Sequence, residues 1–316
     1  MHKESKHSSS ADHNNRVFTV GDIKLELSHL DKVFWPEEHI TKGDILEYYD
    51  KIYSYIIPYL KDRPESLRRN PNGLLDEGFF QKDVREIAPD WAKTITLYSE
   101  SVGKDIDYFV CDDKASLLYL VNLGCIELNP WNSRIATIDN PDYCILDLDP
   151  GEKNTFDDII EVALAIRQTA DAVRIPSFCK TSGARGLHIY IPLGAMYSYE
   201  ECRGFALLIA KIMVKELPQL TTIERSLHKR PANKIYIDYL QNKKGQTLAS
   251  AYSVRPRAHA TVSAPLEWKE VKKGLRPAQF TIQSIFKRLD KKGDLFAGVL
   301  EKGIDMKMAL QSLEKI

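Results

Sequence analysis

The distribution of apolar and polar residues along the first half of the chain predicts short strands and one long helix. Two alternating segments, at 17–20 and 23–27, flank a Gly-Asp pair, which is typical of a β-hairpin. Thr41 and Asp44 have the spacing of a helix-capping box, and the apolar residues after them recur at helical spacing. We therefore expect a hairpin and then a helix that ends near Pro58.

The second half shows longer strands and helices that alternate. Strands are expected at 143–149, near Phe178, at 187–191 and at 234–240. Helices are expected at about 116–122, from Asn154 or Thr155 onward, and from Ser198 to Pro218. Residues 265–316 are also expected to be helical, with a basic face. The pattern as a whole predicts an α+β fold of two packed β-sheet subregions flanked by helices.

The same pattern suggests how the chain is divided. Residues 1–16 contain almost nothing apolar and are expected to form a disordered leader or linker. Residues 17–302 are expected to form one catalytic domain, with subregions of about 17–135 and 136–302, followed by a C-terminal tail at 303–316.

Composition narrows the class of protein. The 316 residues are 43% hydrophobic and 28% charged, which is typical of a globular protein, and no apolar run reaches the length of a membrane span or a signal peptide. Five scattered cysteines indicate neither a disulfide framework nor a zinc site. Lysine plus arginine balance aspartate plus glutamate at 44 each, so net charge alone does not indicate a nucleic-acid partner. We expect an intracellular protein.

Two acids mark the end of the expected strand at 143–149. Side chains alternate between the faces of a strand, so Asp147 and Asp149 point to the same face, and Pro150 then ends the strand. Like charges at the end of a buried strand are costly unless cations or hydrogen bonds compensate them. A divalent metal ion would compensate these charges. An isolated Asp-x-Asp before a turn, however, is usually a pair of solvated acids in a loop.

Two further strand ends carry polar groups. The segment from Ser182 to His188 contains two glycines that permit a tight turn, whose N–H groups could face an anion together with Ser182 and Arg185. Asp238 lies on the polar face of the expected strand 234–240. Each feature alone fits a plain turn or a salt bridge. Together, three carboxylates and an anion-binding turn are what two-metal phosphoryl transfer requires.

These motifs resemble a known family. Asp147-Leu-Asp149, Ser182-Gly-x-x-Gly-Leu-His188 and Ile235-Tyr-Ile-Asp238 look like the three motifs of the archaeo-eukaryotic primase superfamily. More narrowly, residues from about 27 to 300 resemble the polymerase domain of bacterial ATP-dependent DNA ligase D. Further segments share this likeness: Leu30-Asp-Lys32-Val-Phe-Trp-Pro36, Thr41-Lys42-Gly-Asp44, Pro71-Asn-Gly73, Gly78-Phe-Phe-Gln-Lys82 and Tyr252-Ser-Val-Arg255.

The resemblance implies a primase-polymerase fold and a template-directed nucleotidyltransferase that adds nucleotides, chiefly ribonucleotides, to 3′ ends at DNA gaps and double-strand breaks in non-homologous end joining. By this likeness Asp147, Asp149 and Asp238 would hold two divalent ions, Mn²⁺ or Mg²⁺, with an NTP or dNTP as substrate. The residues implied to hold the incoming nucleotide are Ser182, Arg185, His188, Arg255, Arg230 and Arg68, with Phe79 or Phe80 stacking on the base. Lys32 and Lys42 would bind a DNA 5′-phosphate.

The chain departs from the family pattern at three places. Asn129 stands where some members carry a histidine, which puts the role of that histidine in doubt here. Ala251 replaces a proline common before Tyr252. The spacing between Arg230 and Asp238 is irregular, so a triphosphate contact from Arg230 is the least supported of the implied roles.

Two other classes of protein stay open at this stage. Asp90, with Asp112-Asp113-Lys114, formally fits a short metal-dependent nuclease pattern. A non-catalytic module that binds DNA ends is the other alternative. The Lys-x-Asp-Gly adenylation motif of ligases does not occur in the sequence, so nick sealing is not expected from this chain. The family implies DNA with ends or gaps as a partner, Ku and a ligase D ligase domain in cis or in trans as further partners, no membrane, and a cytoplasmic, nucleoid-associated location.

Overall fold

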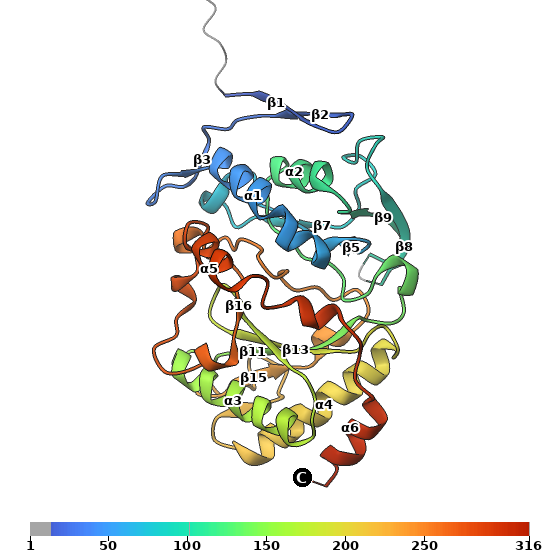
Figure 1. Cartoon of the computed structure of the whole chain (residues 1–316), viewed down its shortest axis with the longest axis vertical. Coiled ribbons are helices and arrows are strands. Elements are labelled where there is room, and N and C mark those ends of the chain that lie inside the picture. Colours follow the sequence, from blue (N-terminus) through green and yellow to red (C-terminus); the bar gives the residue numbers. More distant parts are fainter. Residues whose placement is uncertain (1–13, 101, 316) are drawn as a thin grey trace, which may run out of the picture.

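An antiparallel hairpin opens the part of the chain that this computed structural model describes, residues 14–100 and 102–315. Its strands are β1 (Arg16–Val20) and β2 (Ile23–Leu27), as the alternation at 17–27 predicts. The hairpin lies at one end of the molecule, above the first two helices (Figure 1). The leader expected at 1–16 falls mostly outside the described residues, and Arg16 already belongs to β1.

The first part of the chain packs two helices against small sheets. Thr41 caps α1 (Lys42–Leu60) through the predicted capping box with Asp44, and α2 is Lys114–Asn122. The helix ends at Leu60, near Pro58 as predicted, and the proline in its last turn removes one N–H donor without breaking the turns before it. Strands pair in the orders β10-β6-β7, β5-β9-β8 and β3-β4. Their bounds are β3 (Val33–Trp35), β4 (Ile40–Thr41), β5 (Pro64–Glu65), β6 (Leu67–Arg69), β7 (Phe79–Gln81), β8 (Thr94–Ser99), β9 (Lys104–Val110) and β10 (Cys125–Glu127).

A six-stranded sheet forms the second part, in the order β14-β15-β11-β13-β12-β16. Its strands are β11 (Tyr143–Asp149), β12 (Phe178–Thr181), β13 (Leu187–Pro192), β14 (Thr221–Thr222), β15 (Ile235–Asp238) and β16 (Pro265–Leu266). The helix α3 (Phe156–Ala172) begins after Thr155, one of the two expected starts, and α4 (Tyr199–Glu216) begins after Ser198 as predicted; both residues form capping boxes. Both helices pack against the central strands (Figure 1).

The two faces of β11 have different neighbours. Cys144 contacts the backbone of Cys202 in α4, so the helices cover that face. Tyr143 points to the opposite face, where its ring lies under the guanidinium of Arg63 at 5.2 Å. Because residues two apart share a face, Asp147 also points toward the first part of the chain.

Two sequence expectations about the C-terminal half were wrong in extent. The strand expected at 234–240 ends at Asp238, because Tyr239 turns into the helical region and Asp238 accepts a hydrogen bond from Leu240 N at 2.9 Å. The region 265–316 is not one continuous helix, since prolines and glycines divide it into short α- and 3₁₀-helices joined by irregular segments. Its α-helices are α5 (Ser284–Lys292) and α6 (Met306–Leu313).

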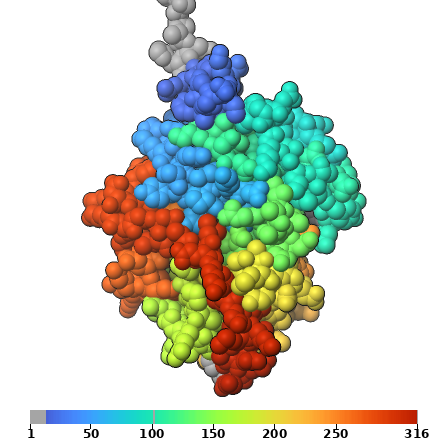
Figure 2. Space-filling model, turned by 45° about the vertical axis from the view of Figure 1, so that its right-hand side comes forward, coloured from blue at the N-terminus to red at the C-terminus, as the bar shows by residue number. Residues whose placement is uncertain are grey.

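The C-terminal segment returns to the first part of the chain before it ends beside α4. Asp294 accepts hydrogen bonds from Tyr59 in α1 and from Tyr252, each at 2.6 Å, and from Phe296 N at 2.9 Å. The red segment in Figure 2 runs from the blue region to the opposite end of the molecule. In the described residues, no helix is both long and apolar enough to span a membrane.

Asp294→Ala should destabilise the protein by about 2–3 kcal/mol, because two tyrosine hydroxyls and one N–H lose a carboxylate acceptor. Chemical denaturation followed by circular dichroism measures this change. Asp290→Ala, at an exposed position of α5, is the matched control and should stay within about 0.5 kcal/mol of wild type. Equal stability of the two variants would show that Asp294 does not tie the segment to α1.

Candidate active site

Strand register gathers three carboxylates on one face of the sheet. Asp147 lies two residues before Asp149 on β11, and it pairs directly with Asp238 on the antiparallel strand β15. Residues opposite each other in antiparallel strands share a face, as do residues two apart on one strand. One oxygen from each carboxylate can therefore lie within 4.8 Å of the other two. This is the cluster that the sequence predicts from two separate strand ends.

The cluster is electrostatically unfavourable unless a cation joins it. Burial, followed by the charges of Asp149 and Asp238, raises the pKa of Asp147 well above its ordinary value. The pKa of Asp149 is also raised, by partial desolvation and then by Asp238, although its side chain reaches solvent at the rim. Carboxylate oxygens in this arrangement are the ligands that hard divalent cations prefer. The donor set therefore fits a divalent metal site.

A polar row continues across the sheet from this cluster. His188 pairs with Asp147 across β13 and β11, and its Nε2 lies 3.3 Å from Asp147 Oδ1. Lys180 pairs with His188 across β12 and β13, and its Nζ lies 2.8 Å from His188 Nδ1. The row therefore runs Asp238, Asp147, His188, Lys180 over four strands. Lys180 is completely buried, and our sequence analysis did not select it.

The turn between β12 and β13 is held by its own serine. Ser182 Oγ accepts hydrogen bonds from the backbone N–H of Ala184 and Gly186, at 3.1 and 3.0 Å. The sequence analysis suggested that the N–H groups of this turn face an anion. These two N–H groups are instead bonded to Ser182 and are not directed at an anion. Gly183 has φ of +69°, and a Cβ on Gly186 would lie 2.3 Å from Leu148 O, so both glycines are required. The Ser182 hydroxyl proton and Arg185 remain the turn's polar groups toward the cavity.

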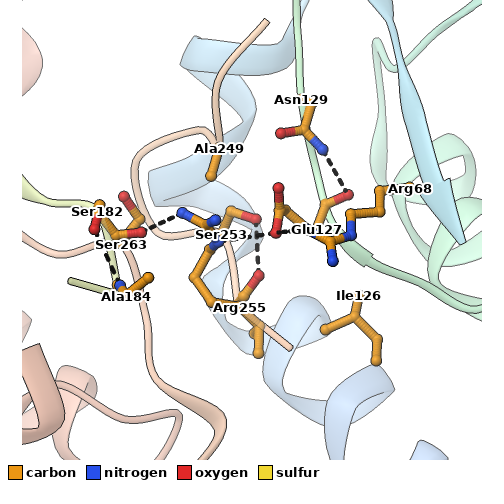
Figure 3. Close-up of polar contacts among 12 residues, drawn as sticks. Arg68, Ile126, Glu127, Asn129, Ser182, Ala184, Ala249, Ser253, Arg255 and Ser263 are labelled. Carbon is orange, nitrogen blue, oxygen red and sulfur yellow. Dashed lines mark hydrogen bonds and ion pairs between the residues drawn. The ribbon is translucent and has the colours of Figure 1, made fainter. Parts of the chain in front are cut away.

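A salt bridge connects this turn to the first part of the chain. Arg255 donates from Nε to Glu127 Oε2 at 2.8 Å and from its guanidinium to the carbonyl of Ser182 (Figure 3). Arg68 Nη1 lies 3.5 Å from the same Glu127 oxygen. Glu127 is a buried acid that the sequence analysis missed, and its only signal was a charge inside the apolar strand β10. It holds two arginines in place at the edge of the site.

One cavity of about 290 Å³ brings most of the predicted residues together. Phe80, Glu127 and Asn129 from the first part of the chain face the sheet residues across it. The predicted site residues that line it are Asp147, Asp149, Ser182, Arg185, His188, Arg255 and Phe80. Asn129, the departure from the family pattern, is thus at the cavity wall, and its Nδ2 lies 3.4 Å from the Glu127 carbonyl.

Other predicted residues lie beside the cavity. The guanidinium of Arg230 covers the Tyr236 ring at 3.8 Å and donates to the carbonyls of Glu224 and Arg225. Phe79 and Phe80 are both exposed, but only Phe80 lines the cavity.

Lys32 and Lys42 line a different cavity, of about 310 Å³. Lys42 Nζ donates to Ser28 O at 2.6 Å and to Asn122 Oδ1 at 2.7 Å. Burial, followed by the charge of Lys32, lowers the pKa of Lys42 to about 8. Lys32 donates to Asn72. Two cations in one cavity are suited to an anion.

Three residues of the nuclease pattern, Asp112, Asp113 and Lys114, have structural partners. Asp112 accepts hydrogen bonds from Asp62 N and Lys93, Asp113 caps α2, and Lys114 pairs with Asp50. They belong to the first part of the chain, and the metal-type cluster found among the described residues is the one on β11 and β15.

Comparison with known proteins agrees with this geometry. The fold matches a solved structure described as "Polymerase Domain from Mycobacterium tuberculosis Ligase D in complex with DNA", with a TM-score of 0.81 and 28% identity over 89% of this chain and 99% of that one. Fold and site together define a nucleotidyltransferase of the primase-polymerase type, a class that uses a divalent metal and a nucleoside triphosphate. Residues 41–296 match the family described as LigD, primase-polymerase domain. The chain belongs to this family.

Curated relatives are longer proteins. The chain is 35% identical to the "Bifunctional non-homologous end joining protein LigD" of Bacillus subtilis over 271 residues, which are 85% of this chain and 43% of that protein. It is 30% identical to the "Multifunctional non-homologous end joining protein LigD" of Mycolicibacterium smegmatis, over 87% of this chain and 36% of that protein. The chain therefore spans less than half the length of these relatives.

Asp147→Asn should stabilise the protein at neutral pH in the absence of divalent ions. Because the folded state raises the pKa of Asp147 and Asp149, it binds protons more tightly than the unfolded chain, so stability falls as the pH rises above about 4. Removing one charge should raise the melting temperature at neutral pH by about 2–4 °C, the equivalent of about 1 kcal/mol.

The same melting experiment tests metal binding. Mn²⁺ should raise the melting temperature of wild type and should raise that of Asp147→Asn much less. Asp139→Asn, at an exposed carboxylate, is the control and should respond to Mn²⁺ as wild type does. An identical response in all three proteins would argue against a metal site at Asp147.

Proposed function

We propose that this chain adds nucleotides, preferentially ribonucleotides, to 3′ ends at DNA gaps and double-strand breaks under the direction of a template. The observation that carries the proposal is the carboxylate cluster of Asp147, Asp149 and Asp238, of which Asp147 and Asp149 line a cavity that also contains cationic groups and an aromatic ring. Nucleotidyl transfer requires these components, since it depends on positioning and on stabilising phosphate charge.

Each wall of the cavity has a role in this proposal. Asp147, Asp149 and Asp238 hold two divalent ions, Mn²⁺ or Mg²⁺. When bound, such ions activate the 3′-hydroxyl and stabilise the charge on the triphosphate and on the leaving pyrophosphate. The triphosphate is held by Ser182, Arg185, His188 and Arg255, with Arg230 at the side. Phe80 stacks on the base, whereas Phe79 lies on the other face of β7, and Arg68 lies near the sugar.

The cavity that contains Lys32 and Lys42 binds the 5′-phosphate across the gap, because ammonium groups there can neutralise a dianion. The wider setting is end joining, with DNA as partner, Ku and a ligase domain in cis or in trans as further partners, and a cytoplasmic, nucleoid-associated location. Residues 17–302 act as one catalytic unit, which the contacts of Asp294 with Tyr59 and Tyr252 support.

A nuclease and a non-catalytic DNA-binding module explain the site less well. A binding module has no use for three carboxylates that repel both each other and DNA phosphates. The nuclease pattern at Asp112–Lys114 is occupied by structural contacts.

Primer extension on a gapped duplex tests the proposal. Wild type should extend the 3′ end in Mn²⁺, more strongly with ribonucleotides than with deoxyribonucleotides. Asp238→Ala should reduce extension by at least about a thousandfold while DNA binding survives, because a metal ligand is lost but the cationic surfaces remain. The control Asp139→Ala should extend normally. Strand cleavage in place of extension would favour the nuclease, and binding without extension by wild type would favour the non-catalytic module.

The 5′-phosphate grip should depend on pH. With a pKa of about 8, Lys42 is charged at pH 7 and largely neutral at pH 9, so the advantage of a 5′-phosphate over a 5′-hydroxyl should shrink over this range. Extension rates on the two substrates at both pH values give this ratio. Lys42→Ala should reduce the ratio at pH 7 and make it insensitive to pH, whereas Lys51→Ala, an exposed position of the same helix, should behave as wild type. A ratio in wild type that is unchanged at pH 9 would contradict this assignment.

A further inference from the structure

Lys180 has a place in the site that the functions assigned above do not explain. Its side chain is completely buried on β12, one residue before the end of the strand that leads into the Ser182 turn. Nζ lies 2.8 Å from the Ala249 carbonyl, 2.7 Å from Ser263 Oγ and 2.8 Å from His188 Nδ1. A buried ammonium group is costly unless its three N–H donors are all satisfied, and here three partners surround it.

The direction of two of these hydrogen bonds is fixed by chemistry. The Ala249 carbonyl can only accept. Ser263 Oγ lies 2.7 Å from the Thr181 carbonyl and donates its hydroxyl proton there, so it accepts from Lys180. The third N–H of the ammonium group is therefore directed at His188.

This donation determines which nitrogen of His188 carries the proton. If Nδ1 accepts from Lys180, a neutral imidazole carries its proton on Nε2, where it can donate to Asp147 Oδ1 at 3.3 Å. The opposite tautomer would direct the Nε2 lone pair at a carboxylate oxygen. An imidazole whose Nδ1 accepts a hydrogen bond from an ammonium group is neutral, because both nitrogens of an imidazolium carry protons and neither can accept.

We propose that Lys180 is a positioning residue that holds His188 as the Nε2–H tautomer, with this proton directed at Asp147 and at the phosphate side of the cavity. The role of His188 toward the triphosphate rests on the proposed function, whereas its tautomer does not. Lys180 itself has no surface toward the cavity, so its positioning role is exerted through His188, while its charge also acts on Asp147. In metal sites, outer partners that orient a functional histidine contribute about 10–100-fold to affinity or activity.

Nitrogen-15 NMR of histidine-labelled protein tests the tautomer directly. The spectrum is recorded with Mg²⁺ at about pH 6, because burial and then Arg255 lower the pKa of Lys180 to about 7 and the ammonium form is required. The His188 resonances are assigned by their loss in His188→Gln. An Nε2–H signal with an unprotonated Nδ1 is expected. An Nδ1–H tautomer, or an imidazolium, would overturn the proposal, and neither outcome depends on polymerase activity or on whether a Lys180 variant folds.

Lys180→Met tests the coupling. The variant should lose the single-tautomer signal and lower kcat/KM for nucleotide addition by about tenfold or more. In the His188→Gln background, the same change should cost less than about threefold, because the side chain through which Lys180 acts is already gone. Ser263→Ala, which removes another partner of Lys180, is the matched control and should keep the Nε2–H tautomer. Equal losses from Lys180→Met in both backgrounds would show a merely structural role and overturn the proposal.

Discussion

Mutual repulsion among three carboxylates is the constraint around which the site is built. Asp147, Asp149 and Asp238 are brought together by the antiparallel pairing of β11 with β15, which the sheet cannot relax without losing its register. Cations from other segments act on this charge: Lys180 and Arg255 lower the pKa of Asp147, against the larger effect of burial. The protein surrounds the cluster with positive charge without cancelling it, which leaves a strong preference for divalent cations.

Each buried charged group around the carboxylates needs hydrogen-bond partners of its own. The guanidinium of Arg255 is held by Glu127 from the first part of the chain and by the Ser182 carbonyl from the second. Glu127 in turn contacts Arg68. A buried ion pair contributes little net stability but fixes geometry when its partners are satisfied. Here the pair of Arg255 and Glu127 fixes the separation of the two walls of the cavity. The shape of the site therefore depends on how the two parts of the chain pack together.

The sequence predicts the elements that local signals determine, but not the contacts that depend on which strands pair with each other. Alternation around Asp147, the helix start at Asn154 or Thr155, and the capping box at Ser198 predicted β11, α3 and α4, because these signals act within a few residues. Lys180 could not be selected from the sequence, because its role depends on its pairing with His188 across β12 and β13. The region 265–316 was expected to be helical, but prolines and glycines divide it into short helices, and contacts such as those of Asp294 hold the segments between them.

A small sheet separates the two anion sites. Arg68 and Arg69 are consecutive on β6 and so point to opposite faces, and each lies over a ring of the paired strand β7, Arg68 over Phe80 and Arg69 over Phe79. Arg69 lines the cavity of Lys32, whereas Phe80 lines the carboxylate cavity. Under the proposed function, the thickness of this sheet sets the distance between the growing 3′ end and the 5′-phosphate. The alternation of side chains between the two faces of these strands would then fix the spacing between the two sites.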